Sequence, residues 1–91
     1  MKQRRAIVSV IGKDQVGIIA KVTNVLADNR INILDISQTI LQDFFTMMML
    51  VDVTNSENLE ALQNELSEIG KAMNLNITVQ LEEIFQAMHR V

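Results

Sequence analysis

Short apolar runs and helical patterns alternate along the chain. Residues Ala6–Ile11 are β-branched and almost wholly apolar, which is typical of a central strand covered on both faces. A turn edged by Gly12 and Gly17 ends this strand. From Ile18 onwards, apolar residues recur at i, i+1, i+4, i+7 and i+8, which predicts an amphipathic helix. We expect Asn29 to cap its C-terminus, because asparagine tolerates the left-handed conformation.

The next two segments show the period of β-strands. Within Ile31–Gln42, apolar and polar residues alternate, which predicts a strand with one buried face. The apolar residues of that face are Leu34, Ile36 and Ile40. Residues Phe44–Val53 form a second strand that is apolar on both faces. The short turn between the two predicts an antiparallel hairpin.

A second helix and a fourth strand follow the hairpin. Thr54 and Glu57 have the spacing of a capping box, with Thr54 as the N-cap. Apolar residues then recur with helical spacing up to Asn74, which ends the helix. Gly70 lies inside this helix, where glycine costs about 1 kcal/mol relative to alanine. Residues Leu75–Leu81 alternate as the fourth strand.

The C-terminal segment Glu82–Val91 has a third helical stripe, formed by Ile84, Phe85, Met88 and Val91. A helix this short is marginal alone in water, so we expect it to dock on the domain or on a partner. The strand Phe44–Val53 is also apolar on the face that the two longer helices do not cover. The terminal helix, a second subunit or both must cover that face, and we expect a homodimer.

The predicted order of strand, helix, strand, strand, helix and strand is the ferredoxin-like βαββαβ pattern, an α+β fold. Right-handed crossovers place both helices on one face of a four-stranded antiparallel sheet. We expect a single domain over residues 1–91, with a core over about residues 4–81 and an extra C-terminal helix over about residues 82–90.

The composition narrows the chemistry that the domain can perform. Of the 91 residues, 48% are hydrophobic and 21% charged, as in a globular protein. There is no cysteine and one histidine, His89, so we expect no metal site, no cofactor and no catalytic residue. A net charge of −3 argues against a nucleic-acid partner. No run suits a membrane span or a signal peptide, so we expect a cytoplasmic protein without a membrane partner.

The turn Lys13–Gly17 is the first candidate site. At a helix N-terminus, free backbone N–H groups and the helix dipole can bind a carboxylate or a phosphate. Alternatively, the turn is a simple connection in which Asp14 or Gln15 caps the helix. It lacks the P-loop and dinucleotide-binding motifs. It is similar to the loop of acylphosphatases, but Ile18–Ala20 stand where those enzymes have a phosphate-binding arginine.

Two further groups of residues have both a functional and a structural interpretation. Asn32 and Asn76 open strands, where a side-chain amide can contact a ligand or simply bond to the adjacent loop. Met47-Met48-Met49 could form an adaptable binding surface. Because a strand alternates its faces, the three methionines cannot share one surface, and packing in the core and at an interface is favoured.

Three segments carry a family resemblance. Residues Val8–Val22 resemble the opening of an ACT domain, in which a strand leads through an Asp/Asn-x-x-Gly turn into an aliphatic helix. Residues Asn32–Thr39 resemble the second strand of that domain. Residues Glu83–Met88 resemble the tail of the small stand-alone ACT proteins of the UPF0237 group.

The resemblance implies a non-catalytic regulatory module that binds an amino acid or a related metabolite between paired domains, commonly with side-by-side sheets. The implied ligand-binding residues are Asp14, Gln15, Val16, Gly17, Ile18, Asn32 and Ile33. Asp14 stands where many amino-acid-binding members have asparagine, and Gly12 where some have histidine. The alternative is therefore a pure dimerisation or protein-interaction module without a small-molecule ligand. Either module would act through a protein partner that the sequence does not identify.

The two halves of this candidate site are distant in one chain. In a split βαβ arrangement, the turn before the first helix and the start of the next strand lie at opposite ends of that helix. A ligand that touches both Gly17 and Asn32 would therefore bridge two subunits, and binding would be linked to dimerisation.

Overall fold

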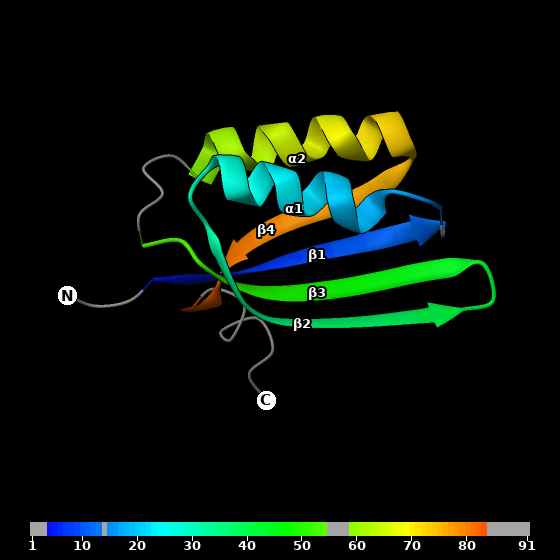
Figure 1. The fold of residues 1–91 in the computed structure, drawn as a ribbon, viewed down its shortest axis with the longest axis horizontal. Helices are drawn as coiled ribbons and strands as arrows, with labels where there is room; N and C mark the ends of the chain where they lie inside the picture. The colour runs from blue at the N-terminus through cyan, green and yellow to red at the C-terminus, as the bar shows by residue number, and fades with distance from the viewer. Residues whose placement is uncertain (1–3, 14, 55–58, 84–91) are drawn as a thin grey trace.

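The computed structural model describes residues 4–13, 15–54 and 59–83 of the chain. Its strands and helices are β1 (Arg5–Lys13), α1 (Ile18–Asp28), β2 (Asn32–Leu41), β3 (Phe44–Asp52), α2 (Leu59–Met73) and β4 (Leu75–Leu81) (Figure 1). The predicted βαββαβ order is confirmed. The extra helix that we expected over about residues 82–90 falls, from residue 84 onwards, outside the described residues.

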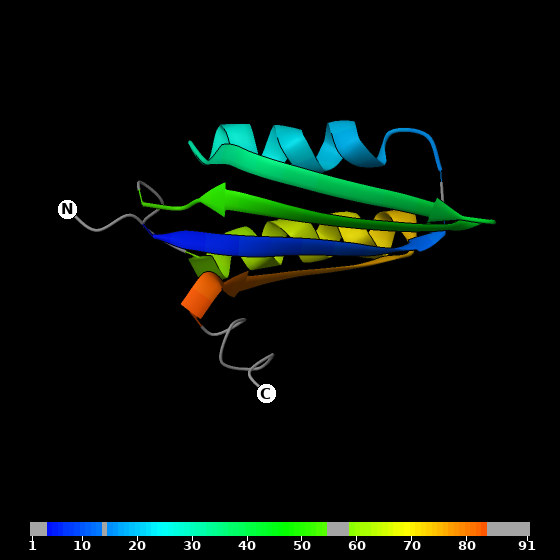
Figure 2. The same cartoon turned by 90° about the horizontal axis from the view of Figure 1, so that it is seen from below.

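The four strands form one antiparallel sheet in the order β2-β3-β1-β4 (Figure 2). The central strand β1 pairs with β3 along its whole length, from Arg5 opposite Asp52 to Lys13 opposite Phe44. Both helices lie on the same side of the sheet (Figure 1). This is the ferredoxin-like arrangement that the order of elements predicts.

The core lies between the two helices and one face of the sheet. Its fully buried side chains come from alternate positions of β1 and β3 and from one stripe of each helix: Ala6, Val8, Val10, Met47, Met49, Val51, Val22, Leu26, Leu62 and Leu66. Each large aliphatic side chain buried in this way contributes about 1.5–3 kcal/mol relative to an exposed position. On the other face of β1, Ile11 is 50% exposed. The prediction that β1 is covered on both faces is therefore wrong for the described residues, because both helices lie on one side.

The edge strand β2 differs most from its prediction. Leu34, Ile36 and Ile40 are 40–56% exposed instead of forming a buried face. The helices bury the central strands and leave nearly all of β2 in solvent. A β-bulge shifts the register between Ile33 and Asp35, so that Leu34 is an extra residue in the pairing with β3. No segment among the described residues thus packs over these exposed apolar residues of β2.

A residue with left-handed geometry follows each of the two helices. Asn29 is the C-cap of α1, as predicted, but its φ is −97 and the left-handed residue is Arg30, with φ 59. Asn74 has φ 60 and ends α2 as predicted. The hydroxyl of Thr54 accepts a hydrogen bond from the Arg4 amide at 2.9 Å, and its proposed capping partner Glu57 lies outside the described residues. Neither described helix is long and apolar enough to cross a membrane.

Candidate ligand site at the turn before the first helix

The turn between β1 and α1 exposes the N-terminal end of α1. Gly17 is the N-cap of α1, and its φ of 93 lies in the region that glycine adopts without strain. Glycine has no side chain to satisfy the amides of the first turn, and that turn contains no acidic residue. A side chain added at Gly17 would meet no atom within 4 Å. The approach to these amides is therefore open to an anionic group.

Gln15 has a structural role in this turn. Its side-chain nitrogen Nε2 donates to the carbonyl oxygen of Met73 at 2.6 Å and to that of Lys13 at 3.4 Å. Gln15 therefore caps the C-terminal end of α2, not the N-terminal end of α1 as the structural alternative supposed. The bond to Met73 ties the turn to the second helix and holds the backbone of the turn in place.

The other turn residues divide into buried and accessible. Ile18 is 2% exposed and belongs to the core, whereas Val16 is 99% exposed. Asp14 lies outside the described residues. Among the described turn residues, Val16 and Gly17 are thus available for contact with a ligand, while Gln15 and Ile18 support the backbone.

Asn32 and Ile33 lie at the opposite end of the molecule from the turn (Figure 1). Asn32 is exposed and stands opposite Asp52 of β3, while Ile33 is half-buried. The eleven residues of α1 separate the two groups, which corresponds to a distance of about 16 Å along the helix axis. The structure therefore does not bring the two halves of the candidate site together within one chain.

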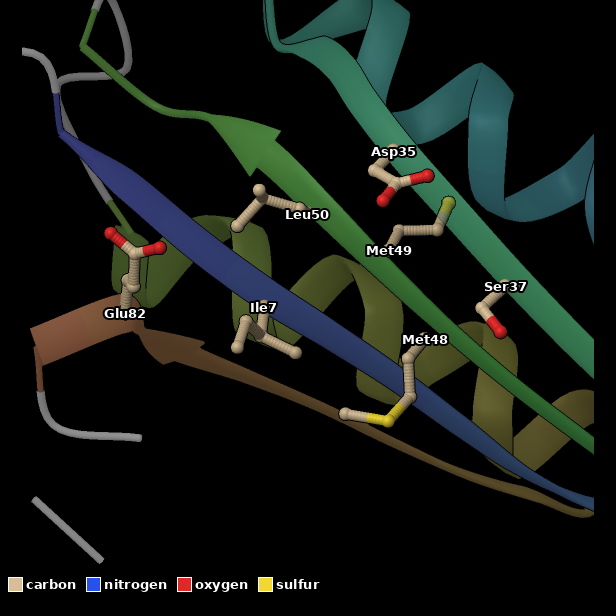
Figure 3. A pocket seen from close by; sticks show the side chains of 7 residues that line it. All are labelled: Ile7, Asp35, Ser37, Met48, Met49, Leu50 and Glu82. Carbon is tan, nitrogen blue, oxygen red and sulfur yellow. The ribbon is translucent and has the colours of Figure 1, made fainter. Parts of the chain in front are cut away.

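A second concave surface lies on the sheet face opposite α1 and α2. This hollow, of about 290 Å³, is lined by Ile7, Met48, Met49 and Leu50, with Asp35, Ser37 and Glu82 around them (Figure 3). The side chains of Ile7 and Met48 point into the same space from neighbouring strands (Figure 3). Sequence reasoning missed this hollow, although it predicted that this face of the third strand would be apolar and need cover.

The charges around the hollow argue against an amino-acid site there. Its lining includes the carboxylates of Asp35 and Glu82 but no basic side chain that would bind the carboxylate of an amino acid. Glu82 is already engaged in an ion pair with Arg5, whose nearest nitrogen–oxygen distance is 2.7 Å. The apolar floor suits contact with other apolar side chains better than contact with a zwitterion.

The remaining candidates of the sequence have structural roles in the described part of the chain. Met47 and Met49 are fully buried and Met48 is 38% exposed, which agrees with packing on alternate faces. Asn76 is exposed opposite Ile11 in the pairing of β4 with β1. The described residues contain no group of three histidine, cysteine or acidic side chains that could hold a metal ion; His89 lies outside them.

The comparisons with known proteins identify the class to which this fold and turn belong. The family model of the ACT domain matches residues 4–80. A UPF0237 protein of Clostridium acetobutylicum is 52% identical over 88 residues, which cover 96% of this chain and 99% of the relative. The chain therefore belongs to the ACT domain family and, within it, to the UPF0237 group.

Solved structures agree with this assignment. An ACT domain protein from Streptococcus pneumoniae is 39% identical, has a TM-score of 0.80, and is matched over 93% of this chain and 97% of its own. The regulatory subunit of aspartate kinase from Thermus thermophilus, in a ligand-free form, is 22% identical with a TM-score of 0.66. This chain covers 52% of that subunit, and 87% of this chain is matched. At that identity the second likeness shows a shared fold only.

Proposed function

We propose that the chain is a non-catalytic regulatory domain that forms a homodimer through its β2 strands and binds an amino acid or a related metabolite at the dimer interface. The observation that carries the dimer is the exposed β2 edge, over which no described segment packs. Its exposed apolar residues are Leu34, Ile36 and Ile40. A long edge strand with apolar side chains is a template for pairing with another strand, and a second copy of the chain offers the same edge.

The direction of β2 supports a ligand site shared by two subunits. β2 runs away from Asn32 and ends at Leu41, on the same side of the molecule as the start of α1 (Figure 1). In an antiparallel pair of β2 strands, the beginning of one strand lies next to the end of the other. Asn32 of the partner subunit would then approach the turn at Gly17, although the two are far apart in one chain.

The chemistry at the two ends suits a zwitterionic ligand. The open amides at the start of α1 would accept a carboxylate, because they carry the positive end of the helix dipole. The side-chain amide of Asn32 can both donate to and accept hydrogen bonds from the ligand's polar groups. Regulatory subunits use this fold, as the aspartate kinase subunit illustrates. A small regulatory domain of this kind would transmit the bound state to a separate protein partner.

A panel of amino acids in thermal denaturation tests the ligand. A binder at a hundredfold excess over its Kd stabilises the folded state by about 2.7 kcal/mol. If no amino acid shifts the melting temperature, the chain is a dimerisation module without such a ligand, which is the second candidate. The exposed β2 edge favours that candidate as much as the first, since pairing alone would cover it.

The dimer itself is tested by sedimentation of a charged-edge variant. Ile36→Lys places a charge on the β2 edge and should yield a monomer, because edge charges oppose strand pairing. Ile11→Lys is the matched control, since Ile11 is 50% exposed but lies on the central strand β1. A dimeric Ile36→Lys variant, or a monomeric parent protein at micromolar concentration, would contradict pairing through β2.

A further inference from the structure

The two edge strands of the sheet, β2 and β4, differ in how their outward-facing backbone groups are hydrogen-bonded. At the β4 edge, the side-chain amide of Gln63 reaches from α2 to the strand backbone. Its oxygen Oε1 accepts from the Val79 amide at 2.7 Å, and its nitrogen Nε2 donates to the Ile77 carbonyl at 3.1 Å. These are the donor and acceptor that an additional strand would need for pairing. One glutamine therefore occupies the pairing positions in the middle of β4.

The glutamine is held in this position by its own helix. Nε2 of Gln63 also donates to the hydroxyl of Ser67, one turn further along α2, at 3.0 Å. The three hydrogen bonds satisfy both hydrogens of the amide nitrogen and the oxygen. A side chain with no free donor has little tendency to rotate away and expose the strand.

A glycine brings α2 against the beginning of the same strand. A Cβ at Gly70 would lie 2.6 Å from the carbonyl oxygen of Leu75, closer than real side chains approach. Gly70 follows Gln63 by two helical turns, about 10 Å along α2. Leu75 and Val79 are four residues apart in β4, which spans about 13 Å. The helix thus follows the strand from its first residue to its middle.

The β2 edge has no comparable cover from a helix in the described part of the chain. Its residues are exposed almost throughout. The carboxylate of Asp35 accepts a hydrogen bond from the adjacent Ile36 amide at 2.9 Å. This contact is local to the strand, so an incoming strand can replace it without moving a helix.

We infer that α2 closes the β4 edge through Gln63 and the Gly70 contact, and that this closure confines sheet extension to β2, where the partner is a second copy of this chain. Chains with two open edges can add to one another without end, whereas chains with one open edge stop at a pair. The statement about β2 rests on the proposed function. The statement about β4 does not, because it depends only on contacts within one chain.

The test is Gln63→Leu, which keeps the bulk of the side chain but removes the amide. The control is Asn64→Leu, at the exposed neighbouring position on α2. In Gln63→Leu, hydrogen exchange at the Val79 amide should become about tenfold faster or more, because that amide loses its acceptor. Sedimentation velocity at increasing concentration should show species larger than those of the parent, while Asn64→Leu should match the parent.

A second variant distinguishes pairing of β4 edges from nonspecific hydrophobic association. Gln63→Lys also removes the acceptor for Val79 but places a charge on the edge, so it should speed exchange without producing larger species. Larger species in both variants, or an unchanged distribution in Gln63→Leu, would overturn the inference.

The parent protein provides a further test should Gln63→Leu fail to fold. Its Val79 amide should exchange far more slowly than a free peptide, and free-peptide exchange there would overturn the closure of β4. A parent protein that sediments as a monomer would contradict the proposed dimer. The exchange rate of the Val79 amide would still test the closure of β4 independently.

Discussion

Replacing Gly70 by alanine sets two effects of opposite sign against each other. In a solvent-exposed helix the change is favourable, because alanine has the higher helix propensity by about 1 kcal/mol. In this structure the added Cβ would lie 2.6 Å from the carbonyl oxygen of Leu75, a backbone atom that cannot rotate away. Ordinary van der Waals contact begins at 3.4 Å, so α2 must move away from β4 by roughly 0.8 Å.

The movement has two energetic consequences. Overpacking of this kind costs about 1–3 kcal/mol. The same displacement lengthens the bonds from Gln63 to Ile77 and Val79, which are worth about 0.5–1.5 kcal/mol each. After the gain in helix propensity is included, we expect Gly70→Ala to lower the free energy of unfolding by about 1–5 kcal/mol.

Urea denaturation at a fixed protein concentration measures this difference, since the stability of a dimer depends on concentration. Ala72→Gly is the matched control: Ala72 is exposed on the same helix, and the reverse change there should cost about 1 kcal/mol from propensity alone. If Gly70→Ala is as stable as the parent or more stable, propensity outweighs the contact, and the close approach of α2 to β4 is not what requires glycine.

Three further predictions concern the ligand site and the tail. Gly17→Val should abolish binding of any amino acid found in the panel, because a β-branched residue is strained at φ 93 and its side chain would obstruct the α1 amides. An unchanged affinity in calorimetry would show that the ligand binds elsewhere. Asn32→Ala should weaken the same binding by about 1–3 kcal/mol, and full-strength binding to the monomeric Ile36→Lys variant would refute a bridging ligand. A chain that ends at Glu83 keeps the Arg5–Glu82 ion pair but lacks the apolar tail. This truncation should lower the solubility of the protein and increase the fluorescence of a hydrophobic dye. If both properties match those of the parent, the tail covers no apolar surface.

The order of the elements could be predicted because the periodicities were unambiguous. The strand period of Leu75–Leu81 and the helical stripe from Ile18 are both reproduced in the structure. These patterns depend on which residues share a face, and that is set locally by the backbone geometry of a strand or a helix. The end of α2 at Asn74 could be predicted for a different reason, because asparagine tolerates the positive φ found there.

What covers each face could not be predicted from periodicity. The alternation in β2 shows that Ile36 and Ile40 share a face, but not whether a helix or another chain lies against it. The helices pack over the central strands, so these residues are 45% and 56% exposed. An apolar face that binds a partner has the same sequence pattern as one that packs in the core.

Contacts between segments that are far apart in the sequence could not be predicted from periodicity either. Gln63 is a polar residue on a helix, and nothing in the pattern around it indicates bonds to Ile77 and Val79. From the sequence, Gly70 is only a residue that weakens its helix, whereas the structure shows the close approach that excludes a larger side chain. Of the candidate ligand residues, the separation of the turn from Asn32 followed from topology, but the bond from Gln15 to the end of α2 did not.

The three consecutive methionines of β3 give the sheet an uneven sensitivity to oxidants. Met47 and Met49 are fully buried, whereas Met48 is 38% exposed beside the hollow with Ile7 and Leu50. Peroxide reaches a thioether from solvent, so Met48 should become a sulfoxide well before its two neighbours. The product is polar, and it would make the floor of the hollow wettable while the core stays reduced. Among the three methionines of β3, oxidation would thus occur first at Met48, on the face opposite the helices, and methionine sulfoxide reductases can repair it.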